Sequence, residues 1–187
     1  MNIGFAMCGS FCTFDAVFPV MEAVKKDHTL IPILSFASGS IDSRFGTART
    51  HIEKITDVCG RPPLSCIAEV EPIGPKKLLD ALIIAPCTGN TLAKLAHSIA
   101  DGPVTMAAKS HLRNGRPVVL AVSTNDALAG AAENIGKLLA RKHYYFVPFG
   151  QDDPIRKPTS MVVDFQKIPE TFELALQGQQ FQPIIIS

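Results

Sequence analysis

The stretch DALIIAPCTGNTLAK, Asp80–Lys94, joins an apolar run to a cluster of small polar residues. The run from Ala81 to Ala85 carries only apolar side chains, which is typical of a strand covered on both faces of a parallel sheet. A helical spacing of apolar residues begins at Leu92. The polar residues therefore lie where a strand is expected to end and a helix to begin, which is where open α/β sheets bind ligands.

The same alternation of apolar runs and helical spacing continues along most of the chain. Apolar runs predict strands at 2–7, 29–34, 64–68, 81–85, 117–122 and 144–149. Helical spacing predicts helices at 14–24, 44–58, 92–99, 104–112, 128–139 and 169–177, with one helical turn at 76–79. Segments rich in Ser, Gly, Asp and Pro predict loops at 35–40 and 150–160.

This alternation predicts the fold class. Strands that alternate with helices form right-handed crossover units and a parallel sheet. We expect an α/β fold with a doubly wound, Rossmann-like, mostly parallel sheet and three layers. No internal repeat or linker interrupts the pattern, so residues 1–187 are expected to form a single domain.

Composition limits the function classes. The chain has 187 residues, 47% of them hydrophobic, which argues against disorder, and a net charge of +1, which gives no field that attracts nucleic acid or a membrane. No apolar run approaches the ~20 residues of a membrane-spanning helix, and no signal peptide is recognisable, so a cytoplasmic protein is expected. Five cysteines without a metal-ligand spacing predict free thiols and no metal site.

Polar clusters follow several of the predicted strands. They begin at Cys8, Ser35, Cys87 and Ser123. Ser, Thr and Asn are also the preferred N-caps of helices, so one such cluster indicates only capping. Two clusters add glycine to hydroxyl groups at a helix start, which lets backbone N–H groups approach an anion. No Lys or Arg is expected close by, so the pattern favours a phosphate held by neutral donors.

The missing motifs narrow the choice of cofactor. Neither GxGxxG nor GxxxxGK[ST] occurs, so the dinucleotide and nucleoside-triphosphate fingerprints are absent. Flavin mononucleotide (FMN) remains, because its single phosphate needs one helix N-terminus and its ring edge is rich in hydrogen-bonding atoms.

The segment DALIIAPCTGNTLAKLAHSIADGPVT, residues 80–105, closely resembles the hallmark of the homo-oligomeric flavin-containing decarboxylase family. The resemblance extends over most of the chain, through MNIGFAMCGSF, VVLAVSTNDAL and VPFGQDDPIRKPTSMVVDF. It implies a flavoprotein-like domain that binds FMN and assembles into trimers or larger homo-oligomers. In that family, flavin lies at the contacts between protomers.

The resemblance also implies which residues contact the cofactor. The implied FMN-contacting residues are Gly9, Ser10, Phe11, Ser35, Ser38, Cys87, Thr88, Asn90, Thr91, Ser123 and Thr124. Cys87 is expected to line the flavin rather than to act as a nucleophile, since no base is recognisable beside it. Arg156 and Lys157 are candidates to bind a dicarboxylate substrate, because Arg binds carboxylates bidentately. A solvated loop paired with Asp152 and Asp153 explains them equally well.

The chain departs from the family at the positions that perform its known reactions. Cysteine-type decarboxylases carry a His just before the hallmark strand, where this chain has Pro72. Flavin prenyltransferases carry an Arg-Glu-Thr-Pro run after the later strand, where this chain has 122–125, VSTN. Neither decarboxylation nor prenyl transfer is therefore expected, and no catalytic residue is predicted.

The combination of MNIGFAMCGSFCTF, LIPILSFA and RFGTA with the segment from Pro86 to Leu128 resembles one component of a two-component oxidoreductase from sporulating bacteria, over nearly the whole chain. That resemblance implies a separate partner protein that binds NAD(P), a small cyclic dicarboxylate as substrate, and the mother-cell cytoplasm as location. Two alternatives remain open. One is a non-catalytic scaffold for the partner with a vestigial flavin site. The other is a flavodoxin-like electron carrier, which the near-neutral charge disfavours.

Overall fold

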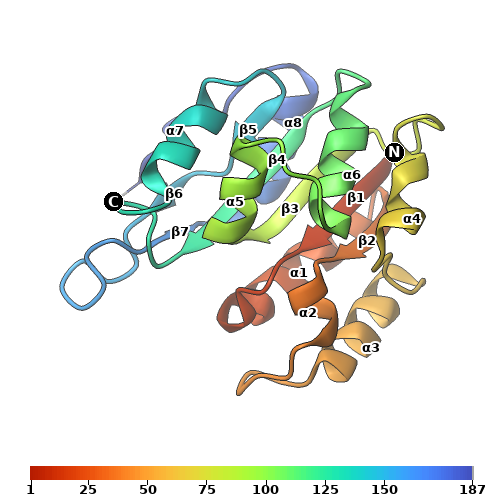
Figure 1. Cartoon of the computed structure of the whole chain (residues 1–187), viewed down its shortest axis with the longest axis horizontal. Coiled ribbons are helices and arrows are strands. Elements are labelled where there is room, and N and C mark those ends of the chain that lie inside the picture. The colour runs from red at the N-terminus through yellow and green to blue at the C-terminus, as the bar shows by residue number, and fades with distance from the viewer. Residues whose placement is uncertain (187) are drawn as a thin grey trace.

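The computed structural model describes residues 1–186, which form a seven-stranded sheet with helices on both faces (Figure 1). The strands are β1 (Asn2–Met7), β2 (Thr29–Leu34), β3 (Ala81–Cys87), β4 (Val118–Thr124), β5 (Tyr144–Phe146), β6 (Phe149–Gly150) and β7 (Met161–Val163). The α-helices are α1 (Phe14–Lys25), α2 (Phe36–Ser40), α3 (Ala48–Cys59), α4 (Ile67–Val70), α5 (Gly89–Ala96), α6 (Pro103–Leu112), α7 (Ala132–Leu139) and α8 (Ile168–Leu176). Short 3-10 turns lie at Phe11–Thr13, Glu71–Ile73 and Phe165–Lys167.

The sheet has a parallel body and an antiparallel end. The parallel strands run in the order β2-β1-β3-β4-β5. This is the 2-1-3-4-5 order of doubly wound folds, in which the connections change direction between β1 and β3. Beside β5, the carboxyl end of β4 pairs antiparallel with β7, and β7 pairs with β6. The predicted doubly wound, mostly parallel sheet is confirmed.

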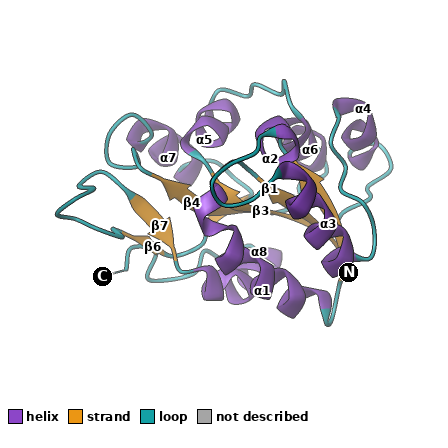
Figure 2. Ribbon diagram, turned by 90° about the horizontal axis from the view of Figure 1, so that it is seen from below, coloured by secondary structure: helices purple, strands orange, loops and turns teal. Residues whose placement is uncertain are grey.

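The predicted three layers are also present. Figure 2 shows α1 and α8 on one side of the sheet and α5, α6 and α7 on the other. All seven residues of β3 are buried, as are the first six of β4. Burial on both faces explains why these two strands carry apolar side chains without alternation.

Two predicted elements between residues 35 and 70 differ from the structure. The predicted loop at 35–40 contains α2, because the Ser35 hydroxyl accepts a hydrogen bond from the Ser38 N–H and caps a helical turn. The predicted strand at 64–68 is wrong. Leu64 makes only an isolated bridge with Ile33, and α4 follows, since the Glu69 carboxylate accepts the N–H groups of Ser65 and Cys66.

Other differences concern the ends of elements. The helix predicted from 44 begins at Ala48, where Thr47 is the N-cap, and the helix predicted from 128 begins at Ala132. The predicted turn at 76–79 is not helical. The predicted strand at 144–149 is divided into β5 and β6, with Val147 and Pro148 between them. Strand β7 was not predicted, because its three residues are too few for a periodic pattern.

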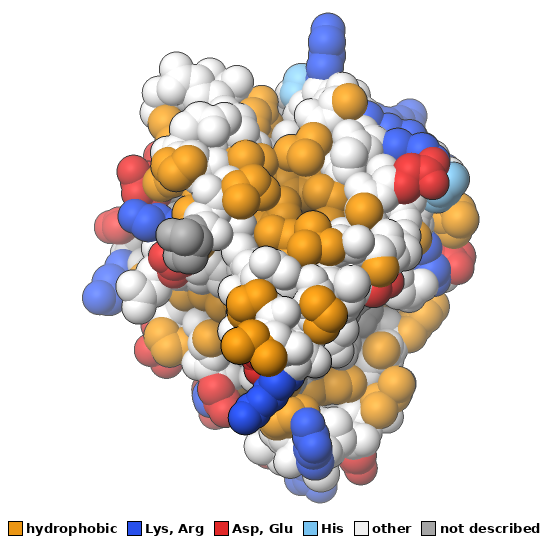
Figure 3. All heavy atoms as spheres, turned by 90° about the vertical axis from the view of Figure 1, so that its left-hand side faces the viewer, with side chains coloured by type: hydrophobic (Ala, Val, Ile, Leu, Met, Phe, Trp, Pro, Cys, Tyr) orange, Lys and Arg blue, Asp and Glu red, His pale blue; other side chains and the backbone are white. Residues whose placement is uncertain are grey.

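One face of the molecule carries an apolar patch. Figure 3 shows apolar side chains gathered at its centre and charged ones around its rim. A groove of about 520 Å³ lies on this side of the molecule, and its lining includes Leu128, Leu139 and Ile185, which are about half exposed. In the described part of the chain, no helix has the length and apolar character needed to cross a membrane.

Candidate functional site

The candidate site lies where the carboxyl ends of β1, β2, β3 and β4 meet. Two adjoining cavities of about 320 Å³ each open there. We call them the Lys94 cavity and the Lys157 cavity. The Lys94 cavity is lined by Cys8, Gly9, Ser35, Phe36, Ala37, Thr88, Asn90, Thr91, Lys94, Asp101, Gly102, Pro103, Val104 and Thr105. The Lys157 cavity is lined by Gly9, Ser10, Cys12, Thr13, Thr88, Ser123, Thr124, Asn125, Asp126, Asp152, Lys157, Ser160 and Val162.

Gly9 and Thr88 line both cavities. They follow β1 and β3, the two strands between which the sheet changes direction. At Gly9 the loop after β1 passes close to α2, and a Cβ atom built there would lie 3.2 Å from the Cβ of Ala37. The absence of a side chain at this position therefore keeps the junction of the cavities open.

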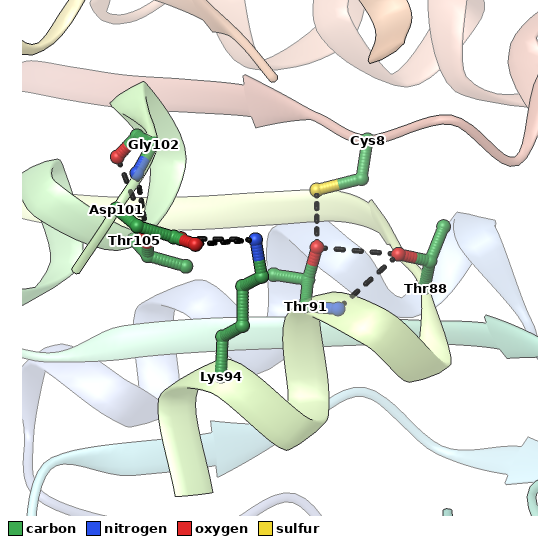
Figure 4. A network of polar contacts seen from close by, with 7 residues as sticks. All are labelled: Cys8, Thr88, Thr91, Lys94, Asp101, Gly102 and Thr105. Carbon is green, nitrogen blue, oxygen red and sulfur yellow. Dashed lines mark hydrogen bonds and ion pairs between the residues drawn. The ribbon is translucent and has the colours of Figure 1, made fainter. Parts of the chain in front are cut away.

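The Lys94 cavity is bordered by the N-termini of two helices. Thr88 caps α5 and Gly102 caps α6, and both residues line the cavity. The Thr88 hydroxyl accepts a hydrogen bond from the Thr91 N–H at 3.4 Å, and the Thr91 hydroxyl donates to Cys8 Sγ at 3.2 Å (Figure 4). Helix N-termini favour anions through their dipoles and free N–H groups.

The Lys157 cavity brings together groups from distant parts of the sequence. The hydroxyls of Ser10 and Ser123 lie 2.9 Å apart and join the loop after β1 to the end of β4. The Thr124 hydroxyl donates to the Asp126 carboxylate. A Cβ atom built on Gly89 would lie 2.7 Å from that carboxylate, so a larger residue at this position would displace the Asp126 side chain.

Two lysines line the cavities, contrary to the expectation that no basic residue lies close. Each is paired: Lys94 Nζ lies 2.9 Å from the Asp101 carboxylate, and Lys157 Nζ lies 2.9 Å from that of Asp152 (Figure 4 shows the first pair). A hydrogen bond from Ser160, together with Lys157, lowers the pKa of Asp152, and Asp152 raises the pKa of Lys157. Because both charges are balanced, an anion here would depend mainly on N–H groups and hydroxyls.

The structure brings most of the predicted site residues to these cavities. Those that line at least one of them are Gly9, Ser10, Ser35, Thr88, Asn90, Thr91, Ser123, Thr124 and Lys157.

Four predicted residues lie outside both cavities. Ser38 is fully buried and its hydroxyl donates to the Met7 carbonyl at 2.7 Å, so it holds α2 against β1. Cys87 is fully buried because β3 extends through it. The Phe11 ring packs against Phe14, with centroids 5.4 Å apart. Arg156 is exposed, and its backbone N–H donates to the Asp153 carboxylate.

Sequence reasoning missed several residues that line the cavities. Lys94 and Asp101 are seven residues apart, with the end of α5 and a loop between them, so no helical spacing relates them. Cys12, Asp126 and Ser160 reach the Lys157 cavity from three different segments. Of Cys12, Asp126 and Ser160, only Asp126 could have been predicted from the sequence, because it lies two residues after β4.

The two buried thiols are not activated. Burial raises the pKa of Cys8 to about 11 and raises that of Cys87 well above the ordinary range. A thiolate is the nucleophilic form of cysteine, so neither side chain is ready to attack at neutral pH. In the described residues, no group of three His, Cys, Asp or Glu side chains converges as a metal site would require.

The exposed and the buried cysteines are expected to be alkylated at different rates. In the native protein at neutral pH, iodoacetamide is expected to modify the exposed Cys12 and Cys66 quickly and to leave Cys8 and Cys87 unmodified. Mass spectrometry of peptides at successive times measures the order, and the protein in denaturant, where all five cysteines react, is the control. Fast modification of Cys8 in the native protein would contradict its placement.

A comparison with known protein families identifies the class to which the chain belongs. The model of the flavoprotein family ("Flavoprotein") matches residues 10–167. The chain therefore belongs to the flavoprotein family.

Within that family the similarity extends to particular proteins. The chain is 46% identical to the B subunit of dipicolinate synthase from Bacillus subtilis (strain 168), over 99% of this chain and 93% of the relative. The crystal structure of the corresponding dipicolinate synthase protein from Bacillus halodurans superimposes with a TM-score of 0.91 at 44% identity, covering 100% of this chain and 96% of that one. The FMN-dependent cysteine decarboxylase SpaF shares the fold, with a TM-score of 0.69 and 23% identity over 95% of this chain and 97% of that one.

Proposed function

We propose that this chain is the B subunit of a dipicolinate synthase and acts with the A subunit of that enzyme. The reaction is the oxidation of dihydrodipicolinate to dipicolinate during sporulation, in the mother-cell cytoplasm. The observation that carries the proposal is the 46% identity to the B subunit of dipicolinate synthase over nearly the whole chain. The absence of the decarboxylase and prenyltransferase residues supports the same choice, since it removes the competing reactions.

The cofactor of this proposal is FMN. The chain's own groups fit it: two helix N-termini border the Lys94 cavity, and hydroxyls and amides line both cavities. Cavities of this size lie within the range of small-molecule sites, and their junction at Gly9 and Thr88 suits a ligand that extends from one to the other. We assign the phosphate to the Lys94 cavity and the ring to the Lys157 cavity. Bound flavin would supply a two-electron acceptor.

Residues of this chain divide into two roles under this proposal. Thr88, Asn90 and Thr91 hold the cofactor at the start of α5. Lys157 is the candidate to orient a carboxylate of the substrate, since it lines the second cavity and can exchange its partner Asp152 for that carboxylate. Arg156 lies in the same exposed loop, and the proposal gives it no separate role.

The oxidation removes two electrons and two protons from the dihydropyridine ring. We assign the final acceptor to NAD(P) on the partner A subunit. This proposal gives the chain a binding and orienting role and assigns the proton transfers to none of its residues. We also propose a homo-oligomer of trimeric or larger size, and the apolar face with Leu128, Leu139 and Ile185 supports a contact between protomers.

A second candidate function is a scaffold for the A subunit with a vestigial flavin site. The observation that favours it is the pairing of both cavity lysines with aspartates, since a phosphate would have to compete with those carboxylates for either lysine. If FMN is a working cofactor, the loss of its contacts should lower activity. If the chain is only a scaffold, the loss should leave activity unchanged.

The double variant Thr88→Val/Asn90→Ala separates the two functions. It removes two polar contacts, each worth about 1 kcal/mol, so FMN affinity should fall about 10- to 30-fold, and activity with the A subunit should fall when FMN is limiting. Fluorescence titration measures the affinity, and gel filtration of the two proteins together verifies the assembly. The matched control is Thr47→Val, which also removes an N-cap but on α3, away from both cavities. Full activity in an intact assembly without FMN binding would favour the scaffold.

A further inference from the structure

A third cavity, of about 570 Å³, adjoins the candidate site at Thr105 and is lined by residues of α5 and α6 and of the segment after α7. Helices α5, α6 and α7 lie on one side of the sheet (Figure 2). The cavity reaches the first residue of β5, Tyr144, and so lies toward the amino ends of the strands rather than their carboxyl ends. We call it the basic pocket. It is lined by Leu95, Ser98, Ile99, Ala100, Thr105, Lys109, Leu112, Arg113, Arg141, Lys142, His143 and Tyr144. Of these, Thr105 also lines the Lys94 cavity.

The charge of the basic pocket is one-sided. Lys109, Arg113, Arg141 and Lys142 line it, and no Asp or Glu among the described residues does. Within residues 1–186, none of these four side chains takes part in an ion pair. The whole chain has 18 basic and 17 acidic residues, so this concentration is not a general property of the surface.

Cations near helix C-termini often only balance the helix dipole. That explanation accounts for Arg141, whose guanidinium donates to the carbonyls of Leu95 at 3.0 Å and Ala96 at 2.7 Å at the end of α5. The side chains of Lys109, Arg113 and Lys142 make no hydrogen bond with the described residues. Lys109 and Arg113 lie at the C-terminal end of α6, so part of their charge also balances a dipole. The ends of α5, α6 and α7 carry about half a negative charge each, which is well below four full positive charges.

The inner wall of the basic pocket is apolar. Leu95 and Leu112 contribute to it, and Ile99 is about half exposed beside them. Tyr144 adds a hydroxyl group to the lining, which can donate a hydrogen bond at neutral pH. Ligand sites in proteins combine such an apolar lining with a few polar groups, and this volume lies in their usual range.

We infer that the basic pocket binds a small organic anion, with its apolar body against Leu95, Ile99 and Leu112 and its carboxylate or phosphate groups at Lys109, Arg113 and Lys142. The inference does not depend on flavin binding, because the pocket and the candidate site share only Thr105. Arg141 holds α5 in place and shapes the pocket rather than being free to follow the ligand.

Calorimetric titration of the full chain with isophthalate tests this inference. Isophthalate joins a flat apolar ring to two carboxylates, and neutral isophthalamide has the same shape without the charge. We expect isophthalate to bind at least about 10-fold more tightly than isophthalamide, since the cations add about 1.4 kcal/mol or more. The variant Lys109→Gln/Arg113→Gln should weaken isophthalate to a similar degree, and Ile99→Glu should do the same by repulsion. The matched control Lys25→Gln/Lys26→Gln removes two charges from the end of α1 and should leave binding unchanged.

Three results would overturn the inference. The first is no heat of binding with isophthalate up to about 10 mM, which corresponds to an affinity too weak for a built site. The second is equal binding of isophthalamide, which would make the cations irrelevant. The third is unchanged binding in both pocket variants, which would place the anion elsewhere, for example beside Lys157. Circular dichroism and thermal unfolding verify that each variant is folded.

Discussion

Replacing Gly9 by valine is expected to weaken FMN binding by at least about 30-fold, or about 2 kcal/mol. Gly9 lines both cavities, and the Cβ atom of any larger residue would lie 3.2 Å from the Cβ of Ala37. The two further methyl groups of valine would enter the junction through which the proposed ligand extends. Fluorescence titration with FMN measures the loss, and Gly9→Ala should give a smaller loss because it adds one methyl group.

Gly136→Val is the matched control for this prediction. A Cβ atom built on Gly136, within α7, has no neighbour within 4 Å, so the same change should leave FMN affinity intact. Thermal unfolding of both variants separates a blocked site from a damaged fold. If folded Gly9→Val bound FMN as tightly as the original protein, the bound ligand would not extend through the junction of the two cavities. The proposed site would then be wrong.

Acid is expected to destabilise the protein through His111 by up to about 3 kcal/mol. His111 is fully buried in α6, and burial lowers its pKa from 6.5 to about 4. One ring nitrogen, Nε2, lies 3.1 Å from the Pro117 carbonyl, while Nδ1 has no partner among the described residues. The unfolded chain therefore binds a proton between pH 6.5 and 4 that the folded chain does not. The contribution of a neutral His111 to the free energy of unfolding is fully present above pH 6.5 and is lost as the pH falls toward 4.

The variant His111→Gln isolates this effect. Its side chain can still donate to Pro117 but cannot bind a proton in this range. Denaturant unfolding between neutral pH and the lowered pKa of His111 should show a steeper loss of unfolding free energy in the original protein than in the variant. Parallel curves for the two proteins would show that His111 does not carry the acid sensitivity.

The parallel body of the sheet was predictable from the sequence for a physical reason. Strand β3 and residues 118–122 of β4 are buried on both faces, so they carry apolar side chains without alternation, which distinguishes them from a half-exposed segment. Helix α2 and strand β7 have five and three residues, which is too short for periodicity to appear. Their formation depends on the Ser35 cap and on pairing with the end of β4.

The candidate site was predictable in part. Polar residues directly after β1 and β3 were found, because the topology of an open parallel sheet brings those positions together. The contact between Ser10 and Ser123 spans 113 residues and joins two such strand ends. The side-chain directions were not predictable. Ser38 and Cys87 carry suitable polar groups, but one bonds to the backbone and the other faces the core. The ion pairs of the two cavity lysines also required the folded chain.

Titration of the full chain with FMN, followed by the visible absorbance of the flavin, tests the proposed cofactor site. We predict saturable binding of one FMN per chain, with a shift of the flavin bands as the ring leaves water. Thr47→Val should bind like the original protein, and Gly9→Val should not reach saturation in the same range. An unchanged spectrum after incubation with about 1 mM FMN, from a folded protein that also carries no flavin as purified, would show that the cavities at Gly9 and Thr88 are not a flavin site.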